Sequence, residues 1–402
     1  TLMLTMLATA LLGGQVFAAD PTGTAVDNCE KTENGYYYGK YSDSESVSGG
    51  NVTIKNETTG QVPNDAQVIG GRAEAGEASN NMVTMQGGTV RAIYGGNGYT
   101  GASNNTVTMQ DGNIQTIYGG WGATGASNNK VTMQGGTVSG TIYGGNAGTA
   151  GNSYNNTVIM TGGSVKTING GASGNNYTAS DNVVIVTGGS INTLLIAGIA
   201  GDAATNNKMH LVGKGASNVN IADAQSNIGT YDGSNGGISL SNVIGGRATM
   251  TGGISTDNSI DIYGTGIEIS GMFAYMQVLT FNITNDAVTD LAPEVAVNLT
   301  STSSGNALDL TDIDLRVKDL DVKEWTPGKT ITLVQSTQAI QGLKDGKVVD
   351  ITNATGAKVA QGKLQLVNGT DGKHRLNLIV QGNVPEPTTG SLSLLALAGL
   401  CA

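Results

Sequence analysis

A repeat of 24 to 27 residues is the feature that most limits what this chain can fold into. Six copies begin with Asn-Asn or Asp-Asn, and the second Asn of each copy recurs at intervals of 24, 24, 27, 26 and 25 residues. These second asparagines are Asn81, Asn105, Asn129, Asn156, Asn182 and Asn207. One such unit cannot bury its own apolar residues, whereas stacked units can, so the period indicates a solenoid.

Each copy contains two extended stretches separated by glycine pairs. In the copy around Val83 and Met85, apolar residues alternate with polar ones, which predicts a strand with one buried face. A Gly-Gly pair follows, and glycine adopts the positive φ of a corner at little cost. Val90 and Ile93 then begin a second stretch, and their spacing of three predicts a bend or a third short strand. A second Gly-Gly ends this stretch, and a polar loop such as 97–103 leads into the next copy.

These patterns predict an all-β fold, a right-handed parallel β-helix with one repeat of 24–27 residues per coil. Equivalent residues should stack ~4.8 Å apart along the axis. Val107 would then lie over Val83 and Met109 over Met85, and the asparagines would form hydrogen-bonded ladders at a corner. A β-propeller is the alternative fold, but its blades need ~40 residues or more.

Composition supports this class and suggests the domain limits. The 402 residues include 62 Gly, which long helices do not tolerate. Charged residues number 14 among the 191 of 78–268, but 22 among the 115 of 269–383, where the paired Asn and Gly also disappear. We expect a β-rich cap there, because an open terminal coil would pair with other chains. The expected domains are a signal peptide (1–18), an N-terminal cap (19–50), the β-helix repeats (51–270), the C-terminal β-rich region (271–383) and a tail (384–402).

The N-terminus has the pattern of an export signal. An apolar run from Leu2 to Leu12 is too short for the ~20 residues of a membrane span. Small residues at Val16 and Ala18 suit cleavage after Ala18. We therefore expect an exported protein.

The C-terminal tail resembles a known sorting signal. Val384 is followed by Pro385, Glu386 and Pro387, and an apolar, helix-forming stretch runs from Gly390. This order of elements is similar to the PEP-CTERM signal, which ends in an Arg cluster that we expect beyond Ala402. The resemblance implies that Pro385, Glu386 and Pro387 form the sorting motif for a transpeptidase-like enzyme. It also implies that the hydrophobic helix enters a membrane.

The arrangement of the coils is similar to the β-helical passenger domains of autotransporter-like surface proteins. The resemblance covers about residues 50–383 and lies in the architecture, with Gly- and Asn-rich coils followed by a more regular C-terminal region. It implies a place on the cell surface.

An aromatic stripe is the candidate site. Tyr94, Tyr118 and Tyr143 occupy equivalent positions, and Trp121 lies in an adjoining loop with Tyr99. Rings exposed in a row ~4.8 Å apart would contact an extended glycan by stacking. A purely structural aromatic ladder is the alternative interpretation.

Other chemistries find little support in the residues. The net charge of −11 argues against nucleic acid, and two His residues leave little for a metal cluster or imidazole catalysis. Glycoside hydrolysis needs two carboxylates ~5–9.5 Å apart, whereas the recurring positions hold Asn, Gly, Thr, Val, Met and Tyr. We interpret Asp257 and Asp261 as solvated turn and strand residues. We predict no enzyme activity, no cofactor and no metal.

The sequence thus predicts an exported bacterial surface or extracellular-matrix protein at the cell envelope. Its role would be structural or adhesive, with a glycan or a host or matrix surface as partner, and it would be sorted through its tail. Two alternatives stay open, a polysaccharide lyase or glycosidase on the same fold and a structural spacer without a ligand.

Overall fold

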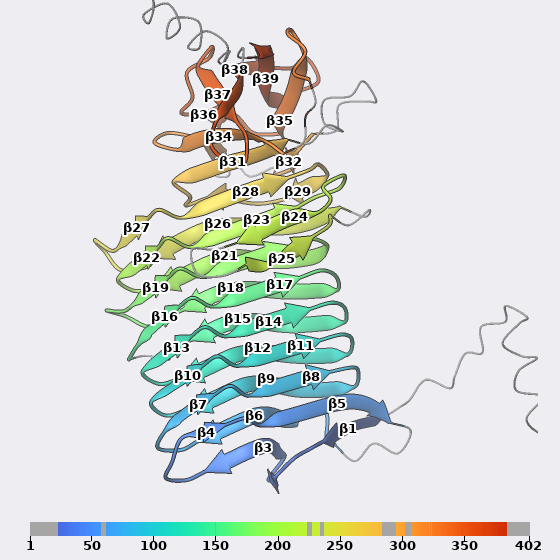
Figure 1. Cartoon of the computed structure of the whole chain (residues 1–402), viewed down its shortest axis with the longest axis vertical. Coiled ribbons are helices and arrows are strands. Elements are labelled where there is room, and N and C mark those ends of the chain that lie inside the picture. Colours follow the sequence, from blue (N-terminus) through green and yellow to red (C-terminus); the bar gives the residue numbers. More distant parts are fainter. Residues whose placement is uncertain are drawn as a thin grey trace, which may run out of the picture.

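A computed structural model describes residues 23–57, 62–148, 150–222, 227–233, 237–283, 295–301, 307–320, 322 and 324–383. Throughout these residues the regular elements are strands, stacked into a long rod (Figure 1). The rod is a parallel β-solenoid of about 9 turns with ~27 residues per turn, followed by a mixed sheet. This confirms the predicted all-β solenoid. The expected signal peptide and the sorting motif at 385–387 lie outside the described residues.

The first face of the solenoid, face one, is built from the x-Val-x-Met-x strands. Neighbouring strands pair in parallel from one coil to the next. Its members are β5 (Asn51–Glu57), β8 (Met82–Met85), β11 (Thr106–Met109), β14 (Lys130–Met133), β17 (Thr157–Met160), β20 (Val183–Val186), β23 (Lys208–Val212), β28 (Ser259–Tyr263), β31 (Val278–Ile283), β34 (Asp314–Asp319) and β37 (Val348–Thr352).

Face two carries the longer strands that contain the Ile-Tyr-Gly-Gly segments. These strands also pair in parallel, and β29 and β30 share one neighbour, β26. They are β3 (Tyr36–Ser42), β6 (Gln67–Ala73), β9 (Thr89–Gly98), β12 (Asn113–Gly122), β15 (Thr137–Asn146), β18 (Ser164–Ala172), β21 (Gly189–Ala200), β26 (Ile238–Ala248), β29 (Ile267–Ile269), β30 (Phe273–Ala274), β32 (Val297–Leu299) and β35 (Thr330–Ser336).

Face three is a sheet of short strands in the segment that we expected to be a polar loop. In the triplets from β7 to β22 the central residue is small and buried, as Ala102 is, so these triplets pack closely against the other faces. The repeated Gly-Ala-Ser triplets were the signal in the sequence. The strands are β4 (Val47–Ser48), β7 (Glu77–Ser79), β10 (Gly101–Ser103), β13 (Gly125–Ser127), β16 (Asn152–Tyr154), β19 (Thr178–Ser180), β22 (Ala203–Thr205) and β27 (Ile254–Thr256).

The coils stack in the predicted register. Val107 pairs with Val83 and Met109 with Met85, and these side chains are fully buried. A single apolar cluster extends along the inside of the rod from Val52 to Val380. Complete burial of a side chain of this size stabilises a protein by ~1.5–3 kcal/mol, so the repeated Val and Met positions supply the interior of every coil.

The second asparagine of each repeat forms the expected ladder inside the corner. The Asn105 amide nitrogen donates to Asn129 Oδ1 at 3.0 Å and to the Ala78 carbonyl at 2.9 Å. Its backbone N–H donates to the same Asn129 Oδ1 at 3.0 Å. Because each amide satisfies buried groups of its neighbours, the ladder removes the cost of burying polar atoms.

The ladder also has a seventh member, Asn258, which we did not predict because it does not follow the regular spacing. Asn207 donates to Asn258 Oδ1 at 2.9 Å although 51 residues separate them. An inserted hairpin, β24 (Val219–Ala222) and β25 (Asn227–Tyr231), interrupts the period between these coils. At the far end the Asn258 N–H donates to Gln277 Oε1 at 3.0 Å, which ends the ladder.

The first residue of each Asn-Asn or Asp-Asn pair has a different role. All seven of these residues have φ between 52° and 57°, in the left-handed region that Asn and Asp tolerate best among non-glycine residues. They make the corner, and the following Asn turns into the interior. They are Asn80, Asn104, Asn128, Asn155, Asp181, Asn206 and Asp257.

The two glycine pairs of a repeat are present for different reasons. At the first pair, Gly88 has φ +89°, which confirms the predicted corner. The second pair, Gly95 and Gly96, lies inside β9 and does not end the stretch as we expected. A Cβ on Gly95 would lie 2.3 Å from the Gly119 carbonyl oxygen, and a Cβ on Gly96 would lie 2.4 Å from the Asn105 amide. Lack of space beside the asparagine ladder therefore excludes any side chain there.

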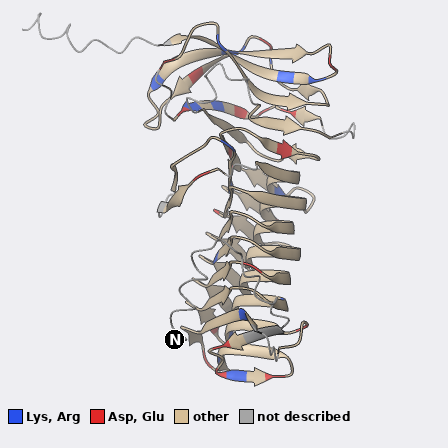
Figure 2. Cartoon of the chain, turned by 90° about the vertical axis from the view of Figure 1, so that its right-hand side faces the viewer, with Lys and Arg blue, Asp and Glu red and all other residues tan. Residues whose placement is uncertain are grey.

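Antiparallel strands close both ends of the rod. At the N-terminus β1 (Gly23–Asp27) pairs with β5, and β2 (Lys31–Glu33) pairs with β3. At the C-terminus β38 (Lys358–Asn368) pairs with β37, β39 (His374–Asn383) pairs with β35, and the two pair with each other. Strands β38 and β39 thereby join faces one and two into one continuous sheet. Charged residues gather toward both ends of the rod (Figure 2).

Parallel coils extend further in both directions than the expected limits of 51–270. β3 already pairs in parallel with β6, and β34 still pairs in parallel with β37. The strands that act as caps are β1, β2, β38 and β39. The change of composition near residue 270 marks a change in surface charge and not the last coil. A short parallel pair, β33 (Leu308–Asp309) and β36 (Ile340–Gln341), lies beside these later coils.

Candidate functional site

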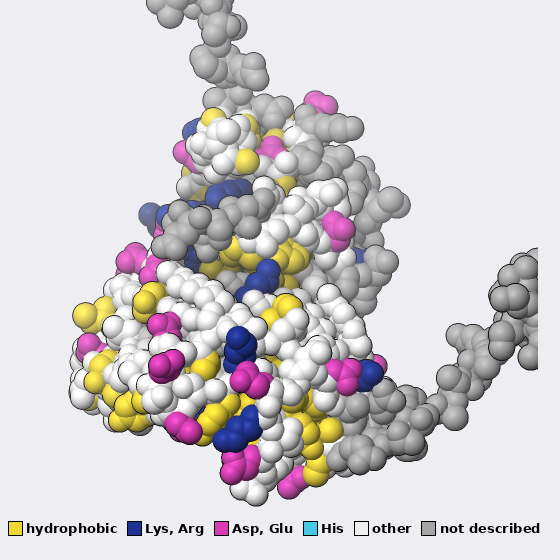
Figure 3. Space-filling model, turned by 60° about the horizontal axis from the view of Figure 1, so that its bottom comes forward, with side chains coloured by type: hydrophobic (Ala, Val, Ile, Leu, Met, Phe, Trp, Pro, Cys, Tyr) yellow, Lys and Arg dark blue, Asp and Glu magenta, His cyan; other side chains and the backbone are white. Residues whose placement is uncertain are grey.

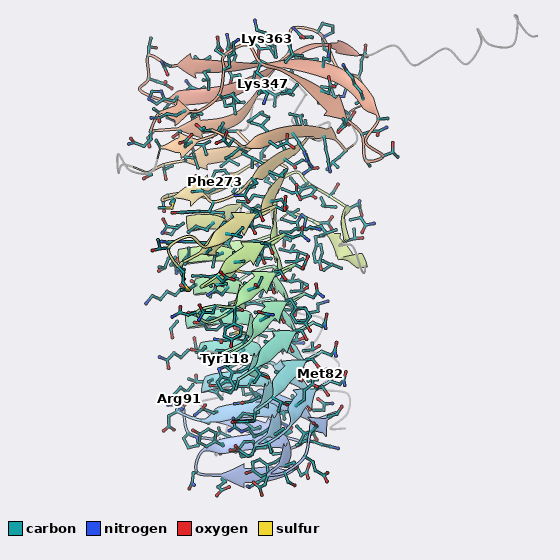
Figure 4. All side chains as sticks on the ribbon, turned by 90° about the vertical axis from the view of Figure 1, so that its left-hand side faces the viewer. Met82, Arg91, Tyr118, Phe273, Lys347 and Lys363 are labelled. Carbon is teal, nitrogen blue, oxygen red and sulfur yellow. The ribbon has the colours of Figure 1, made fainter. Side chains whose placement is uncertain are left out.

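The three predicted tyrosines form a continuous stack on the outside of face two. Tyr94 pairs in register with Tyr118, and Tyr118 with Tyr143. Their ring centroids are 4.7 and 5.0 Å apart, with interplanar angles of 10° and 3°. Figure 4 marks Tyr118 among the stacked coils. Ile69 precedes the stack and Asn169 follows it.

The stack presents ring edges and hydroxyl groups outward, because its ring faces cover one another. A sugar ring therefore cannot stack on the face of the Tyr118 ring. We had expected a row of exposed ring faces on which a glycan would stack. Burial, with the neighbouring Tyr94 and Tyr143, raises the pKa of Tyr118 to about 12, and burial also raises the pKa of Tyr94. In the part of the chain that the structure describes, none of the three hydroxyls has a hydrogen-bond partner. The hydroxyls of Tyr94 and Tyr118 are therefore neutral groups that can donate or accept.

A second row of side chains lies beside the tyrosines because of the Gly-Gly pair. Strict alternation would place Tyr94 and Asn97 on opposite sides of β9. Gly95 and Gly96 both direct their missing side chains inward, toward the asparagine ladder, so the alternation shifts by one residue. Asn97 consequently faces the same side as Tyr94, and Trp121 stacks above it in the next coil.

The two rows enclose a groove of about 330 Å³, which we call the aromatic groove. Tyr99, on the turn after β9, is 62% exposed, and Trp121 is half-buried within β12 and not in a loop. The lining residues are Arg72, Tyr94, Asn97, Tyr99 and Trp121.

Asn97 is the unusual member of this groove. Its side chain is only 7% exposed, and its Oδ1 atom is buried with no hydrogen-bond partner. An unpaired buried acceptor costs ~1–3 kcal/mol, which is why native structures contain few of them. Because solvent does not reach this oxygen, the unpaired acceptor lowers the stability of the groove wall and is not open to a ligand in this conformation.

Carboxylates balance the cations at this end of the molecule. Arg72 donates to both oxygens of Glu74, at 2.9 and 2.8 Å, and this pairing lowers the pKa of Glu74. Lys31 lies 3.0 Å from Glu33 and 3.6 Å from the centre of the Tyr41 ring. Positive and negative side chains are interspersed with apolar ones on the N-terminal end (Figure 3). The surroundings of the aromatic groove therefore carry little net charge.

The structure brings together only part of the predicted site. Tyr94 and Trp121 line the aromatic groove, whereas Tyr118 and Tyr143 continue the stack beyond it. Sequence reasoning missed Arg72 and Asn97. Their signal was positional, because Arg72, Asn97 and Trp121 all occupy the third place after the Tyr or Ile that precedes Gly-Gly.

A second polar cluster lies on the outside of face one, below the inserted hairpin. His210 Nδ1 is 3.3 Å from Asp261 Oδ2 and 3.5 Å from the Tyr263 hydroxyl. Apolar residues of the hairpin, including Val219 and Ile221, pack over the neighbouring strands. Asp261 is therefore not the solvated strand residue that we expected, because the 51-residue interval brings it against His210.

Burial lowers the pKa of His210, and Asp261 only partly opposes this effect; Lys208 and Lys318 lower it further. Because the folded protein binds this proton less readily than the unfolded chain, stability should fall as pH drops below the ordinary His value of ~6.5. We expect His210→Gln to show a weaker loss of unfolding free energy than the wild type between pH 7.5 and 5, measured by urea denaturation. Equal slopes for the wild type and His210→Gln would contradict the assignment.

Across the described ranges, no three His, Cys, Asp or Glu side chains are grouped so that they could hold a metal ion. Nor do those ranges contain a helix of the length and apolar character needed to span a bilayer.

The fold and the groove together define the class of protein, which is a parallel β-solenoid with an aromatic groove on its outer surface. Comparison with known proteins found no matching family model, no matching curated protein and no matching solved structure.

Proposed function

We propose that this chain is an exported bacterial surface or extracellular-matrix protein that binds glycan in the aromatic groove. The observation that carries the proposal is the aromatic groove of about 330 Å³, whose lining combines Tyr94, Tyr99 and Trp121 with the polar side chains of Arg72 and Asn97. Sugars combine apolar C–H faces, which pack on aromatic rings, with hydroxyl groups, which donate hydrogen bonds. A binding site for such a molecule needs aromatic walls and a few fixed polar atoms, and the groove offers both.

The exported location is part of the same proposal and rests on the chain ends. The apolar run before Ala18 suits a signal peptide, and the PEP-CTERM-like motif at Pro385, Glu386 and Pro387 suits recognition by a sorting transpeptidase. The hydrophobic stretch after it would hold the protein at the cell envelope. The architectural likeness to autotransporter passenger domains agrees with display on the surface.

The groove favours binding over the two alternatives. Hydrolysis of a glycosidic bond ordinarily uses two carboxylates, and the five residues that line the groove include none. A spacer without a ligand would gain nothing from the exposed Tyr99 ring beside a groove that Trp121 also lines. We therefore infer an adhesive role and not an enzymatic one.

Binding to a glycan array tests this proposal. We expect the wild type to bind at least one glycan, and Trp121→Ala and Tyr99→Ala each to weaken that binding by about tenfold or more, because central aromatic contacts contribute ~2 kcal/mol or more. Tyr154→Ala is the matched control, since Tyr154 is a 42% exposed tyrosine on face three. A blank array, or equal binding by all four proteins, would refute glycan binding at this groove.

A further inference from the structure

We propose that the open edge of β27, the last strand of face three, is a docking site for an extended segment of another polypeptide, which pairs with β27 in parallel as an added strand. The segment would present an apolar residue, a small residue and a Ser or Thr in succession. This edge and the aromatic groove lie in different coils, so the inference does not depend on glycan binding.

Face three lacks a strand in the coil that follows β27. Between β26 and β28 the chain uses residues 249–258 for a turn, the strand β27 and a corner. In the next coil, which the structure describes in full, only residues 275–277 connect β30 to β31, so this coil contributes no strand to face three. One coil later a short strand, β33, returns at the same place and pairs with β36. Figure 1 shows β27 protruding at the left of the rod.

Unpaired backbone groups line the open edge of β27. The Ile254 N–H donates to the Asp202 carbonyl at 2.8 Å, and the Thr256 carbonyl accepts from the Asn206 N–H at 3.0 Å. Ile254 and Thr256 therefore direct their backbone groups toward β22. Because these groups alternate along a strand, Ser255 directs its N–H and C=O to the opposite side. Among the described strands, β22 is the one that pairs with β27.

The corner after β27 gives independent evidence for the same open edge. In six earlier corners, the N–H of the left-handed Asn or Asp donates to the third residue of the next triplet, as Asn104 does to Ser127 at 3.1 Å. Asp257 is the seventh such residue, and among the described residues its N–H has no acceptor. By the same register, the Gly253 C=O, both groups of Ser255 and the Asp257 N–H form a row to which a parallel strand can bond.

The columns of face three define the side chains that fit above β27. The central residue of the triplet points inward and is small, as Ala204 is below Ser255. The third residue points outward and is Thr205 below Thr256. Ile254, the first residue, is 54% exposed and offers an apolar contact. A strand in the next position therefore needs an apolar residue, then Ala or Ser, then Ser or Thr.

Exposed apolar side chains adjoin this edge. Met250, on the turn before β27, and Tyr275, at the end of β30, are both exposed. The Tyr275 carbonyl accepts from the Gly246 N–H of β26 at 3.0 Å, and the Arg247 guanidinium lies 5.4 Å from the centre of the Tyr275 ring. Edge strands of soluble proteins commonly carry charged residues or proline, which prevent pairing, whereas β27 consists of Ile, Ser and Thr. An apolar edge without such protection is typical of an interaction site.

A second copy of this chain does not fit the edge. Faces one and two continue beyond β27 through β31, β34 and β37 to the antiparallel cap, so the rod rises beside the open edge (Figure 1). Another rod that approached with its own β27 would collide with these coils. A single extended segment avoids this collision, because it needs only the width of one strand.

Hydrogen exchange with a short peptide tests the pairing. We would add the end-blocked peptide Gly-Val-Ala-Thr-Asn-Gly to the full chain at about 1 mM and follow each amide by mass spectrometry. We expect exchange of the Ser255 and Asp257 amides to slow at least about fivefold, because both gain acceptors. The Ile254 amide is the internal control, since it already donates to Asp202.

Methylated peptides test the register. Methylation of the Thr nitrogen removes the donor to the Ser255 carbonyl, and we expect binding at least about tenfold weaker. Methylation of the Ala nitrogen is the matched control and should leave binding unchanged, because that N–H points away from β27. Replacement of the peptide Ala by Leu should also weaken binding at least about tenfold, because the inward column has room only for a small residue.

Two variants of the protein locate the site. Ile254→Lys should weaken binding of the fluorescently labelled peptide about fivefold or more, because it places a charge on the outward column of the edge. Met82→Lys is the matched control and should bind as the wild type does, since Met82 is a similarly exposed residue on face one (Figure 4). Thermal unfolding checks that both variants keep the fold.

Three results would overturn the inference. The first is unchanged exchange of the Ser255 and Asp257 amides with the unmodified peptide. The second is equal binding by the two methylated peptides, since the segment would then not pair in the expected register. The third is a wild-type dimer, measured by light scattering, that Ile254→Lys dissociates, because the edge would then join two copies of this chain.

Discussion

Asn129→Ala is expected to lower the free energy of unfolding by about 3–5 kcal/mol, a large part of the stability of most domains. The Asn129 Oδ1 atom accepts from the backbone N–H and the amide nitrogen of Asn105, both at 3.0 Å. Its own amide nitrogen donates to the Ala102 carbonyl and to Asn156 Oδ1, both at 3.0 Å. Truncation leaves these buried groups unpaired, and each orphaned group costs ~1–3 kcal/mol. Equilibrium unfolding in urea measures the loss.

The adjacent residue provides the matched control. Asn128 forms the corner with φ 55°, a conformation that glycine adopts readily. We expect Asn128→Gly to change the unfolding free energy by less than about 1 kcal/mol. If Asn129→Ala proves as mild as Asn128→Gly, the ladder does not stabilise the solenoid in the way that the contacts indicate.

A chain that ends at Asn353 is expected to self-associate, because both parallel faces then lose their terminal partners. In the intact protein β38 covers the edge of β37, and β39 covers the edge of β35. Without them two rows of backbone N–H and C=O groups are free to pair with another chain. We expect oligomers whose size grows with protein concentration, measured by size-exclusion chromatography with light scattering.

A chain that ends at Asn383 is the control for this truncation. It retains β38 and β39 and lacks the same tail, so we expect it to stay monomeric at the same concentrations. If the chain ending at Asn353 is also monomeric and folded, the antiparallel hairpin is not the device that prevents edge pairing.

The repeat allowed much of the solenoid to be predicted, because residues that recur at one interval must stack on their equivalents. Val83, Val107 and Asn105 showed this at the level of single contacts. The third face was missed because its triplets are short, polar and rich in glycine, which is also the composition of a loop. Only the burial of their central Ala or Ser residues distinguishes them.

Prediction of the candidate site was less complete. Tyr94 and Trp121 were identified, but the role of the tyrosine ring faces was wrong, because the spacing that aligns the rings also makes them cover one another. Asn97 had only a positional signal, its place in register with Trp121, in a chain rich in asparagine. That Asn97 faces the groove depends on the shift of strand alternation at Gly95 and Gly96, which the sequence did not show.

The sequence by itself determined the stacking of this protein. A period near 25 residues, paired Asn at the corners and alternating Val and Met are sufficient, since each repeat buries its apolar face only against a copy of itself. The tertiary structure was needed for the features that arise where this period is interrupted. The glycine pair that shifts strand alternation creates the aromatic groove, and the inserted hairpin brings Asp261 to His210. The β38–β39 hairpin joins two faces. These contacts link residues that no local pattern relates, so only the folded chain defines them.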